Sequence, residues 1–224
     1  MSDEAARRCE PSRDCPLCPR LRAFRAEARR RHPDWYNAPV PSFGDPAATL
    51  LIVGLAPGYA GANRTGRPFT GDYAGEILYP ALLRHGFARG RYEARPDDGL
   101  ELVDCRITNA VRCVPPQNRP TAEEIATCRR FLAGEILAPP RPRVLLALGR
   151  IAFDSALRVL GLTPRRYPFR HAARYELDGA PTLFASYHCS RYNINTGRLA
   201  PESFDGLLAE IATYAAAGRR AACG

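Results

Sequence analysis

Residues 49–72 read TLLIVGLAPGYAGANRTGRPFTGD, an apolar run followed by a loop that contains five glycines and ends in a carboxylate. The run at 49–53 has the length and composition of a strand buried on both faces. The loop matches neither the dinucleotide fingerprint G-x-G-x-x-G nor the P-loop, which ends in Gly-Lys-Ser/Thr. We therefore predict a strand followed by a ligand loop whose exposed amides close on a flat or anionic ligand.

Apolar runs alternate with helical periodicity along the rest of the chain. Further strands are expected at 101–107, 143–148 and 182–186, and helices at 19–32, 73–85, 122–132, 150–160 and 201–217. This alternation predicts an α/β fold with a central parallel β-sheet flanked by helices on both faces, in which sites form at the carboxyl ends of strands. The length fits one domain over residues 1–224, with frayed tails at about 1–12 and 218–224.

The charge balance favours an anionic partner. The net charge is +9, and all 32 basic residues are arginine. Coding bias is the simplest explanation for the missing lysine, although arginine also suits bidentate phosphate contacts. No run is long enough to span a membrane, and the polar N-terminus lacks the pattern of a signal peptide. We expect a cytoplasmic protein that does not bind membranes.

The cysteines indicate metal more than disulfides, because a cytosolic protein keeps its thiols reduced. Cys15 and Cys18 form a C-x2-C pair in front of a helix. Their possible partners are Cys113 and Cys128, which a proline-rich loop at 115–120 could bring together. Four thiolates could hold zinc or an iron–sulfur cluster, and the spacing does not decide between them. The alternative is that Cys113 and Cys128 are ordinary core residues.

Three polar stretches follow predicted strands. In the first, Phe69 could stack on a flat ligand, and Asp72 could act as a base or charge stabiliser, although an Asp before a helix is commonly an N-cap. In the second, Asn109 offers the donor and acceptor that read a nucleobase edge, or is a turn residue. In the third, His188 could donate to a developing oxyanion, or is merely solvated. The third stretch also offers phosphate donors and a possible wedge, Tyr192; the donors are Ser190, Arg191, Asn193, Asn195 and Arg198.

The combination of these stretches resembles family 5 uracil-DNA glycosylases, the UDGb type with an iron–sulfur cluster. The resemblance is carried by GLAPGYAGANRTGRPFTGD, TNAVRCVPPQNRPT and HCSRYNINTGRL together with the four spaced cysteines, and it extends from about residue 15 to about residue 210. It implies a three-layer sheet-and-helix fold, a structural 4Fe-4S cluster, and hydrolysis of the N-glycosidic bond of a deaminated base in DNA.

Carried over by position, the resemblance makes Asp72 the catalytic carboxylate, Asn109 the pocket asparagine and His188 the motif histidine. Phe69 stacks on the base, and the backbone amides around Gly58 and Tyr59 contact its carbonyl oxygens. Other branches of the superfamily place an acid or an asparagine in the first motif, where this chain has Ala56. Uracil, hypoxanthine and xanthine are the expected bases, in DNA bound by a monomer.

One departure from the family pattern concerns the last motif. The family usually has His-Pro-Ser, whereas this chain has His188-Cys189-Ser190. Cysteine frees a φ angle that proline fixes and restores a backbone N–H. We therefore expect a looser or differently aimed loop.

Two other functions fit the sequence less well. A non-catalytic nucleic-acid-binding module with a four-cysteine zinc site would use the same motifs as turns and phosphate contacts. A free-nucleoside hydrolase would have little use for the basic charge.

Overall fold

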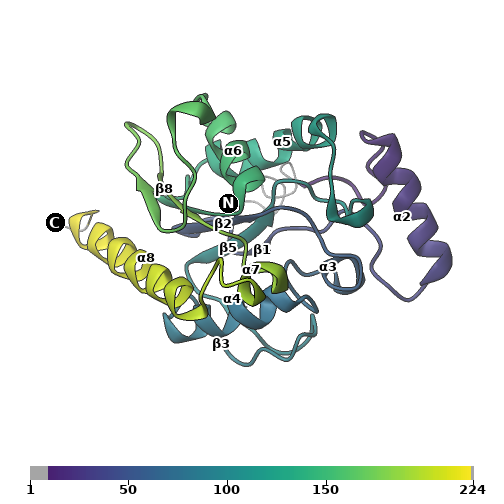
Figure 1. The fold of residues 1–224 in the computed structure, drawn as a ribbon, viewed down its shortest axis with the longest axis horizontal. Helices are drawn as coiled ribbons and strands as arrows, with labels where there is room; N and C mark the ends of the chain where they lie inside the picture. The colour runs from purple at the N-terminus through teal and green to yellow at the C-terminus, as the bar shows by residue number, and fades with distance from the viewer. Residues whose placement is uncertain (1–9, 223–224) are drawn as a thin grey trace.

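A computed structural model describes residues 10–222, and its centre is a six-stranded sheet (Figure 1). Four parallel strands form the middle of this sheet: β2 (Leu50–Gly54), β5 (Cys105–Asn109), β6 (Val144–Leu148) and β8 (Thr182–Ser186). All residues of these strands are buried, as the mostly apolar sequences of β2, β6 and β8 predict, whereas β5 also buries Arg106, Thr108 and Asn109. The predicted strands at 49–53, 143–148 and 182–186 are confirmed within one residue.

The order of the strands places a crevice at β2. The sheet runs β1-β5-β2-β6-β8-β7, so the chain passes from β2 to β5 on one side and then crosses to β6 on the other. In open α/β sheets, ligands bind outside the carboxyl ends of the strands where the order reverses in this way. The glycine loop after β2 and Asn109 at the end of β5 both lie at this edge.

Helices cover both faces of the sheet, as predicted. Helices α4 (Tyr73–Arg84) and α8 (Pro201–Ala222) pack on one face, and α5 (Ala122–Leu137) and α6 (Arg150–Val159) pack on the other (Figure 1). Alternate residues of β2 face the two layers, since Leu50 and Ile52 belong to the first core and Leu51 and Val53 to the second. The structure is thus a three-layer α/β fold.

Smaller elements surround these layers. Helix α2 (Pro19–Arg31) lies at one end of the molecule (Figure 1), as expected from residues 19–32. The two edge strands are antiparallel to their neighbours and were not predicted: β1 (Phe43–Gly44) and β7 (Ala173–Tyr175). The remaining short elements are α3 (Ala62–Thr65), α7 (Arg191–Asn195), and the 3-10 turns η1 (Pro116–Asn118) and η2 (Pro164–Arg166).

The prediction of one strand over 101–107 is wrong. Glu101–Leu102 forms β4, which pairs with β3 (Ala88–Arg89) in a separate two-stranded sheet, and β5 begins only at Cys105. The break is at Asp104, whose φ of 48° is left-handed. Aspartate adopts this conformation more readily than most residues, so the chain can turn there.

The frayed tails at about 1–12 and 218–224 stay a prediction, although both ends of the described chain have structure. Glu10 accepts hydrogen bonds from the backbone of Ser42 and from Arg112, and α8 continues to Ala222. Residues 1–9 and 223–224 of those tails lie outside the described residues. None of the helices in the described part is both long and apolar enough to cross a membrane.

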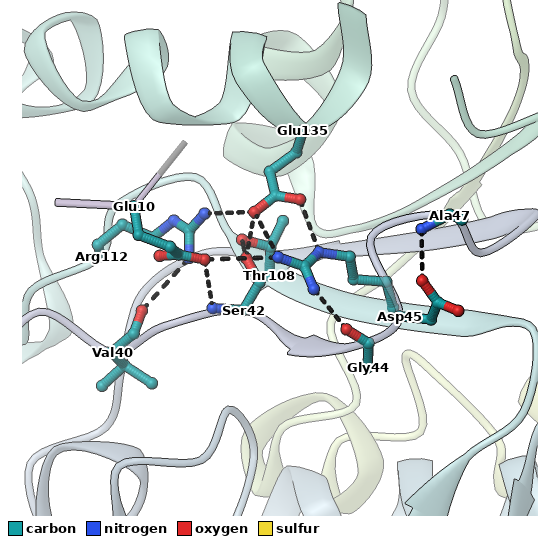
Figure 2. A network of polar contacts seen from close by, with 10 residues as sticks. Glu10, Val40, Ser42, Gly44, Asp45, Ala47, Thr108, Arg112 and Glu135 are labelled. Carbon is teal, nitrogen blue, oxygen red and sulfur yellow. Dashed lines mark hydrogen bonds and ion pairs between the residues drawn. The ribbon is translucent and has the colours of Figure 1, made fainter. Parts of the chain in front are cut away.

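A buried ion network joins β5 to the helix layer beneath it (Figure 2). Glu135 of α5 accepts from Arg106 at 2.7 Å and from Arg112 at 3.0 Å. Arg112 is only 1% exposed. It also pairs with a second carboxylate, because its Nη1 lies 3.0 Å from Glu10 Oε2. Ser42 links Thr108 to Glu135 through its hydroxyl group. The network fixes the segment of chain that connects Asn109 to Cys113.

Candidate active site

A cavity of about 370 Å³ lies at the carboxyl edge of the sheet. Its size is within the range of pockets that hold small molecules. It gathers residues from all three polar stretches, and its lining consists of Leu55, Ala56, Gly58, Phe69, Asp72, Tyr73, Ala74, Asn109, Asn118, His188, Ser190 and Arg191. The fold thus brings together most of the side chains that the sequence indicated.

Asp72 occupies the N-cap position of α4, but its side chain caps nothing. The carboxylate instead turns back into the glycine loop, where the backbone N–H groups of Ala62 and Gly58 donate to it. Gly58 and Gly61 leave the space that it fills: a Cβ on Gly58 would lie 2.3 Å from Asp72 Oδ1, and one on Gly61 would lie 2.0 Å from Asp72 Cγ. This packing explains the need for glycine at both positions. It also overturns the side-chain capping interpretation.

The Asp72 carboxyl group lies in an environment that disfavours its charge. Burial raises its pKa above the usual value, while the N–H donors of Ala62 and Gly58 and the charge of Arg64 oppose the rise. A carboxylate that is desolvated but still hydrogen-bonded by amides is poised to stabilise positive charge or to bind water.

Phe69 and Asn109 form one wall of the cavity, next to Gly54. The Phe69 ring stacks on His188 with 5.8 Å between centroids and 21° between planes. Phe69 takes a left-handed φ of 57°, which is strained for an aromatic residue and aims its ring. A Cβ on Gly54 would lie 2.4 Å from Asn109 Oδ1 and 2.6 Å from Phe69 Cζ, so the amide and the ring meet over this glycine. This wall presents a stacking surface beside a hydrogen-bonding group.

His188 is held in its neutral form. Burial lowers its pKa from 6.5 to about 4. A neutral imidazole keeps one N–H that can donate to a developing negative charge.

The same pKa predicts how stability depends on pH. Between pH 6.5 and about 4, His188 is protonated in the unfolded state but stays neutral in the folded state. The free energy of unfolding therefore decreases progressively as the pH falls through this window. We expect His188→Gln to lose less free energy of unfolding than the parent protein between pH 7 and pH 4.5, measured by urea denaturation. Parallel stability curves for the two proteins would show that His188 titrates normally.

Tyr59 does not line the cavity, and contact of its backbone amide with the base stays a prediction. Its ring packs in an aromatic cluster with Phe24 of α2, His32 and Trp35, at centroid distances of 5.4 to 5.9 Å. The aromatic residues of this cluster attach α2 to the glycine loop. Any part that Tyr59 plays at the site comes from its backbone.

The loop after β8 is held by its own contacts, although it lacks the proline of the family pattern. Ser190 caps α7 by accepting from Asn193 N–H, and Asn193 Nδ2 donates to His188 O at 2.8 Å. Cys189 is fully buried and donates through its thiol to Ala74 O at 3.5 Å. These contacts anchor the loop, and the looser or differently aimed loop expected without the proline stays a prediction.

Several other residues of this segment are exposed. Tyr192 is 72% exposed, the Arg191 guanidinium lies 5.1 Å from the ring centroid of Tyr73, and that of Arg198 lies 4.5 Å from the Tyr187 ring. Arg191 lines the cavity, whereas Tyr192, Asn193 and Arg198 lie beside it. DNA contact by these residues stays a prediction.

Sequence reasoning missed several lining residues. Asn118 lies in η1 and lines the cavity with a left-handed φ of 56°. The QN pair between Pro116 and Pro120 is the signal that could have suggested a turn here, although not that the turn reaches the cavity. Leu55, Tyr73 and Ala74 flank residues that the sequence did indicate.

The four candidate metal ligands converge behind the cavity. Cys18, Cys113 and Cys128 pack in one cluster with Leu21 and Val111, and Cys15 is buried nearby. Arg112 N–H donates to Cys128 Sγ at 3.3 Å, and the Arg25 guanidinium donates to Cys113 Sγ at 2.9 Å. Among the described residues, no three His, Cys, Asp or Glu side chains form a group that could hold a single metal ion. The donor chemistry of four sulfurs with N–H donors fits an iron–sulfur cluster.

Filling the space around Asp72 should disable the site. We expect Gly61→Ala to lower the catalytic rate strongly while the protein still folds, because the new Cβ must push the carboxylate away from the Ala62 amide. Gly86→Ala is the control for adding a methyl group elsewhere, since nothing lies within 4 Å of its added Cβ, although its φ of +76° adds local strain. Single-turnover rates measure both variants, and a parental rate for Gly61→Ala would show that Asp72 has room to move.

The site agrees with comparisons to known proteins. The family model for the uracil DNA glycosylase superfamily matches residues 41–212. A type-5 uracil-DNA glycosylase of Thermus thermophilus is 50% identical over 202 residues, covering 88% of this chain and 91% of that protein. One of Pyrobaculum aerophilum is 43% identical over 208 residues, covering 91% and 88%. A type-4 enzyme of the same organism is 35% identical over 150 residues, covering 66% and 62%.

The chain therefore belongs to the uracil DNA glycosylase superfamily and, within it, to the type-5 uracil-DNA glycosylases. It is an enzyme of the class that hydrolyses N-glycosyl bonds. The alternative of a non-catalytic nucleic-acid-binding module is wrong.

Proposed function

We propose that the protein excises uracil from DNA as a monofunctional glycosylase, leaving an abasic site for base excision repair. The observation that carries this proposal is the Asp72 carboxylate, which the glycine loop holds in a cavity beside the Phe69–His188 stack. The uracil-DNA glycosylase names of the relatives support the substrate.

The residues suggest how a base would be bound. Reaching a base in duplex DNA requires flipping it out, which costs a few kcal/mol and costs least for a mispaired base such as uracil opposite guanine. Phe69 would stack on the extruded base, and the Asn109 amide would read its edge. The Gly58 N–H donates to the Asp72 carboxylate and would orient it. The N–H of the neighbouring Tyr59 would be free to donate to a carbonyl oxygen of the base.

Bond cleavage would then separate charge across the site. The C1′–N bond breaks as the sugar takes on oxocarbenium character and the base departs as an anion. Neutral His188 donates its N–H to the departing base, while Asp72 stabilises the cation and orients the attacking water. Because the chain contains no lysine, no lysine amine can form a Schiff base with the abasic sugar. The reaction ends at the abasic site.

The cavity supports a wider range of deaminated bases. Ala56 and Leu55 line it with small or apolar groups, so few side chains are placed to reject a purine. We infer that hypoxanthine and xanthine are also removed. Single-turnover rates on otherwise identical duplexes with uracil, hypoxanthine or xanthine test this inference, and activity confined to uracil would overturn it.

Polar residues in and beside the cavity would hold the DNA. Arg191, Arg198, Ser190 and Asn193 would contact phosphates, and exposed Tyr192 would act as a wedge in the vacated stack. The enzyme would act as a monomer. Binding should weaken steeply as salt rises, because phosphate contacts release counterions.

Cys15, Cys18, Cys113 and Cys128 would hold a 4Fe-4S cluster with a structural role. When bound, the cluster would cross-link α2 and the 113–128 segment, which are distant in sequence. It would take no part in breaking the glycosidic bond. A brown protein that absorbs near ~400 nm and contains iron and sulfide would support this assignment, whereas a colourless zinc protein would overturn it.

The decisive experiment uses an end-labelled duplex with one uracil–guanine pair. We expect a break at the uracil only after alkali, because an abasic site survives until alkali cleaves the strand. A break without alkali would contradict monofunctional action. No break with any of the three bases, together with release of uracil from free deoxyuridine, would favour a nucleoside hydrolase.

A further inference from the structure

One arginine of α2 is buried without a carboxylate partner. Arg25 is 2% exposed and makes no ion pair within the described part of the chain. Its Nη2 donates to Cys15 O at 2.9 Å, its Nη1 donates to Cys113 Sγ at 2.9 Å, and its Nε has no hydrogen-bond partner. Two cysteines that are 98 residues apart in sequence thus contact one guanidinium group.

The other arginines of the same helix show that this is unusual. Arg20 pairs with Glu124 at 2.7 Å, and Arg29 pairs with Asp14 at 2.6 Å. Burying an unpaired cation costs several kcal/mol, and a guanidinium group cannot escape the cost by losing its proton. A negative group must therefore face Arg25, and the groups in place to supply that charge are the cysteine sulfurs.

We propose that Arg25 is a positioning residue that supplies the counter-charge of the four-cysteine cluster and raises its reduction potential. The proposal rests on the iron–sulfur assignment above. A fixed positive charge that donates to a ligand sulfur stabilises the more reduced, more negative form of a cluster. The bond to Cys15 O holds the C-x2-C loop beside Cys113 at the same time. The Arg25 side chain therefore provides the positive charge and also holds the C-x2-C loop in position.

The test compares three variants of the full chain. Arg25→Met removes the charge and both hydrogen bonds, Arg25→Lys keeps the charge with fewer donors, and Arg22→Met is the control. Arg22 lies on the same helix but is exposed, so its loss changes the helix surface without touching a cysteine. Each protein is measured for iron and sulfide per chain, for the midpoint potential of the cluster by spectroelectrochemical titration, and for the rate of cluster loss in a chelator.

We expect Arg25→Met to lower the midpoint potential by at least ~59 mV, which is a tenfold change in a one-electron equilibrium. Arg25→Lys should restore most of the potential because it restores the charge, while its cluster is lost faster in chelator than that of the parent. Arg22→Met should match the parent in both measurements.

The outcomes separate this inference from the cofactor assignment. A parent protein without iron and sulfide overturns both. A parent with a full cluster and an Arg25→Met variant with unchanged potential and unchanged chelator rate overturns the role of Arg25 alone. If Arg25→Met retains no cluster, the lysine variant decides: a retained cluster of near-parental potential supports the proposal, and a lysine variant without a cluster contradicts a role for charge.

Discussion

Replacing Asp72 with asparagine is expected to slow single-turnover excision of uracil by about 10²–10⁴-fold, the range typical for loss of a catalytic acid or base. The amide keeps the shape of the carboxylate and can still accept from Ala62 N–H, but it has no charge with which to stabilise an oxocarbenium-like sugar. The Asp72→Asn variant should still fold. Since burial disfavours the ionised form, Asp72→Asn should be as stable as the parent or more so.

A true helix cap provides the matched control for this substitution. Thr121 caps α5 through a complete capping box with Glu124, so Thr121→Ala should lose about 1 kcal/mol of stability and keep its excision rate. The opposite pattern is expected for Asp72→Asn. If Asp72→Asn instead lost stability and kept its rate, Asp72 would serve to hold the glycine loop and not to catalyse.

The pH profile gives an independent test of Asp72. Its raised pKa means that the carboxylate takes up a proton at a pH above the usual 3.8 as acid is added. The excision rate of the parent should therefore decrease as the pH is lowered, with a midpoint above pH 3.8. The rate of Asp72→Asn should not show this decrease. If the rate of the variant decreased in acid as that of the parent does, the decrease would be due to another titrating group.

The largest effect on stability is expected at Glu135. Glu135→Gln keeps the size of the side chain but leaves Arg106 and Arg112 facing each other across a buried site with Glu10 as their remaining carboxylate (Figure 2). Removing one partner of a buried ion pair costs about 3–5 kcal/mol. Urea denaturation should show a loss of this size. Asp154→Asn, which breaks the exposed Arg150–Asp154 pair, should change stability by no more than about 0.5 kcal/mol.

Acid should weaken the same network. Burial disfavours the charge of Glu135, but the hydrogen bond from Arg106 and the positive charge of Arg112 outweigh it and hold the Glu135 pKa below its usual value. The stability that Glu135 contributes is therefore present above pH 4.5 and is lost as the pH falls through the lowered pKa. Glu135→Gln should show a shallower loss of stability in acid, and an equal loss would contradict the pairing.

Strands β2, β6 and β8 could be predicted from sequence because each is a short, mostly apolar run between polar loops. The break at Asp104 could not, since it depends on one residue adopting a left-handed φ inside an otherwise extended segment. The edge strands β1 and β7 were missed because two or three residues carry no periodic signal. Their pairing is decided by neighbours far along the chain.

At the site, residue type and position made Asp72, Asn109 and His188 candidates, and only the resemblance of the three motifs gave them their roles. The direction of a side chain was not predictable in the same way. Asp72 turns away from its helix because two glycines make room for it, and Tyr59 leaves the cavity because α2 offers aromatic partners. Asn118 reaches the cavity through the fold of a proline-rich turn, which only the tertiary structure defines.

The short antiparallel edges of the sheet also bear on how the protein behaves at high concentration. The four central strands are buried on both faces, and a buried strand can join other chains into aggregates when its backbone is left open. Here β1 contributes two residues at one edge of the sheet and β7 three at the other, so little unpaired backbone faces outward. Deleting either edge strand would uncover the backbone of a five-residue central strand, β5 beside β1 or β8 beside β7, and we expect such a variant to aggregate at a lower protein concentration than the parent.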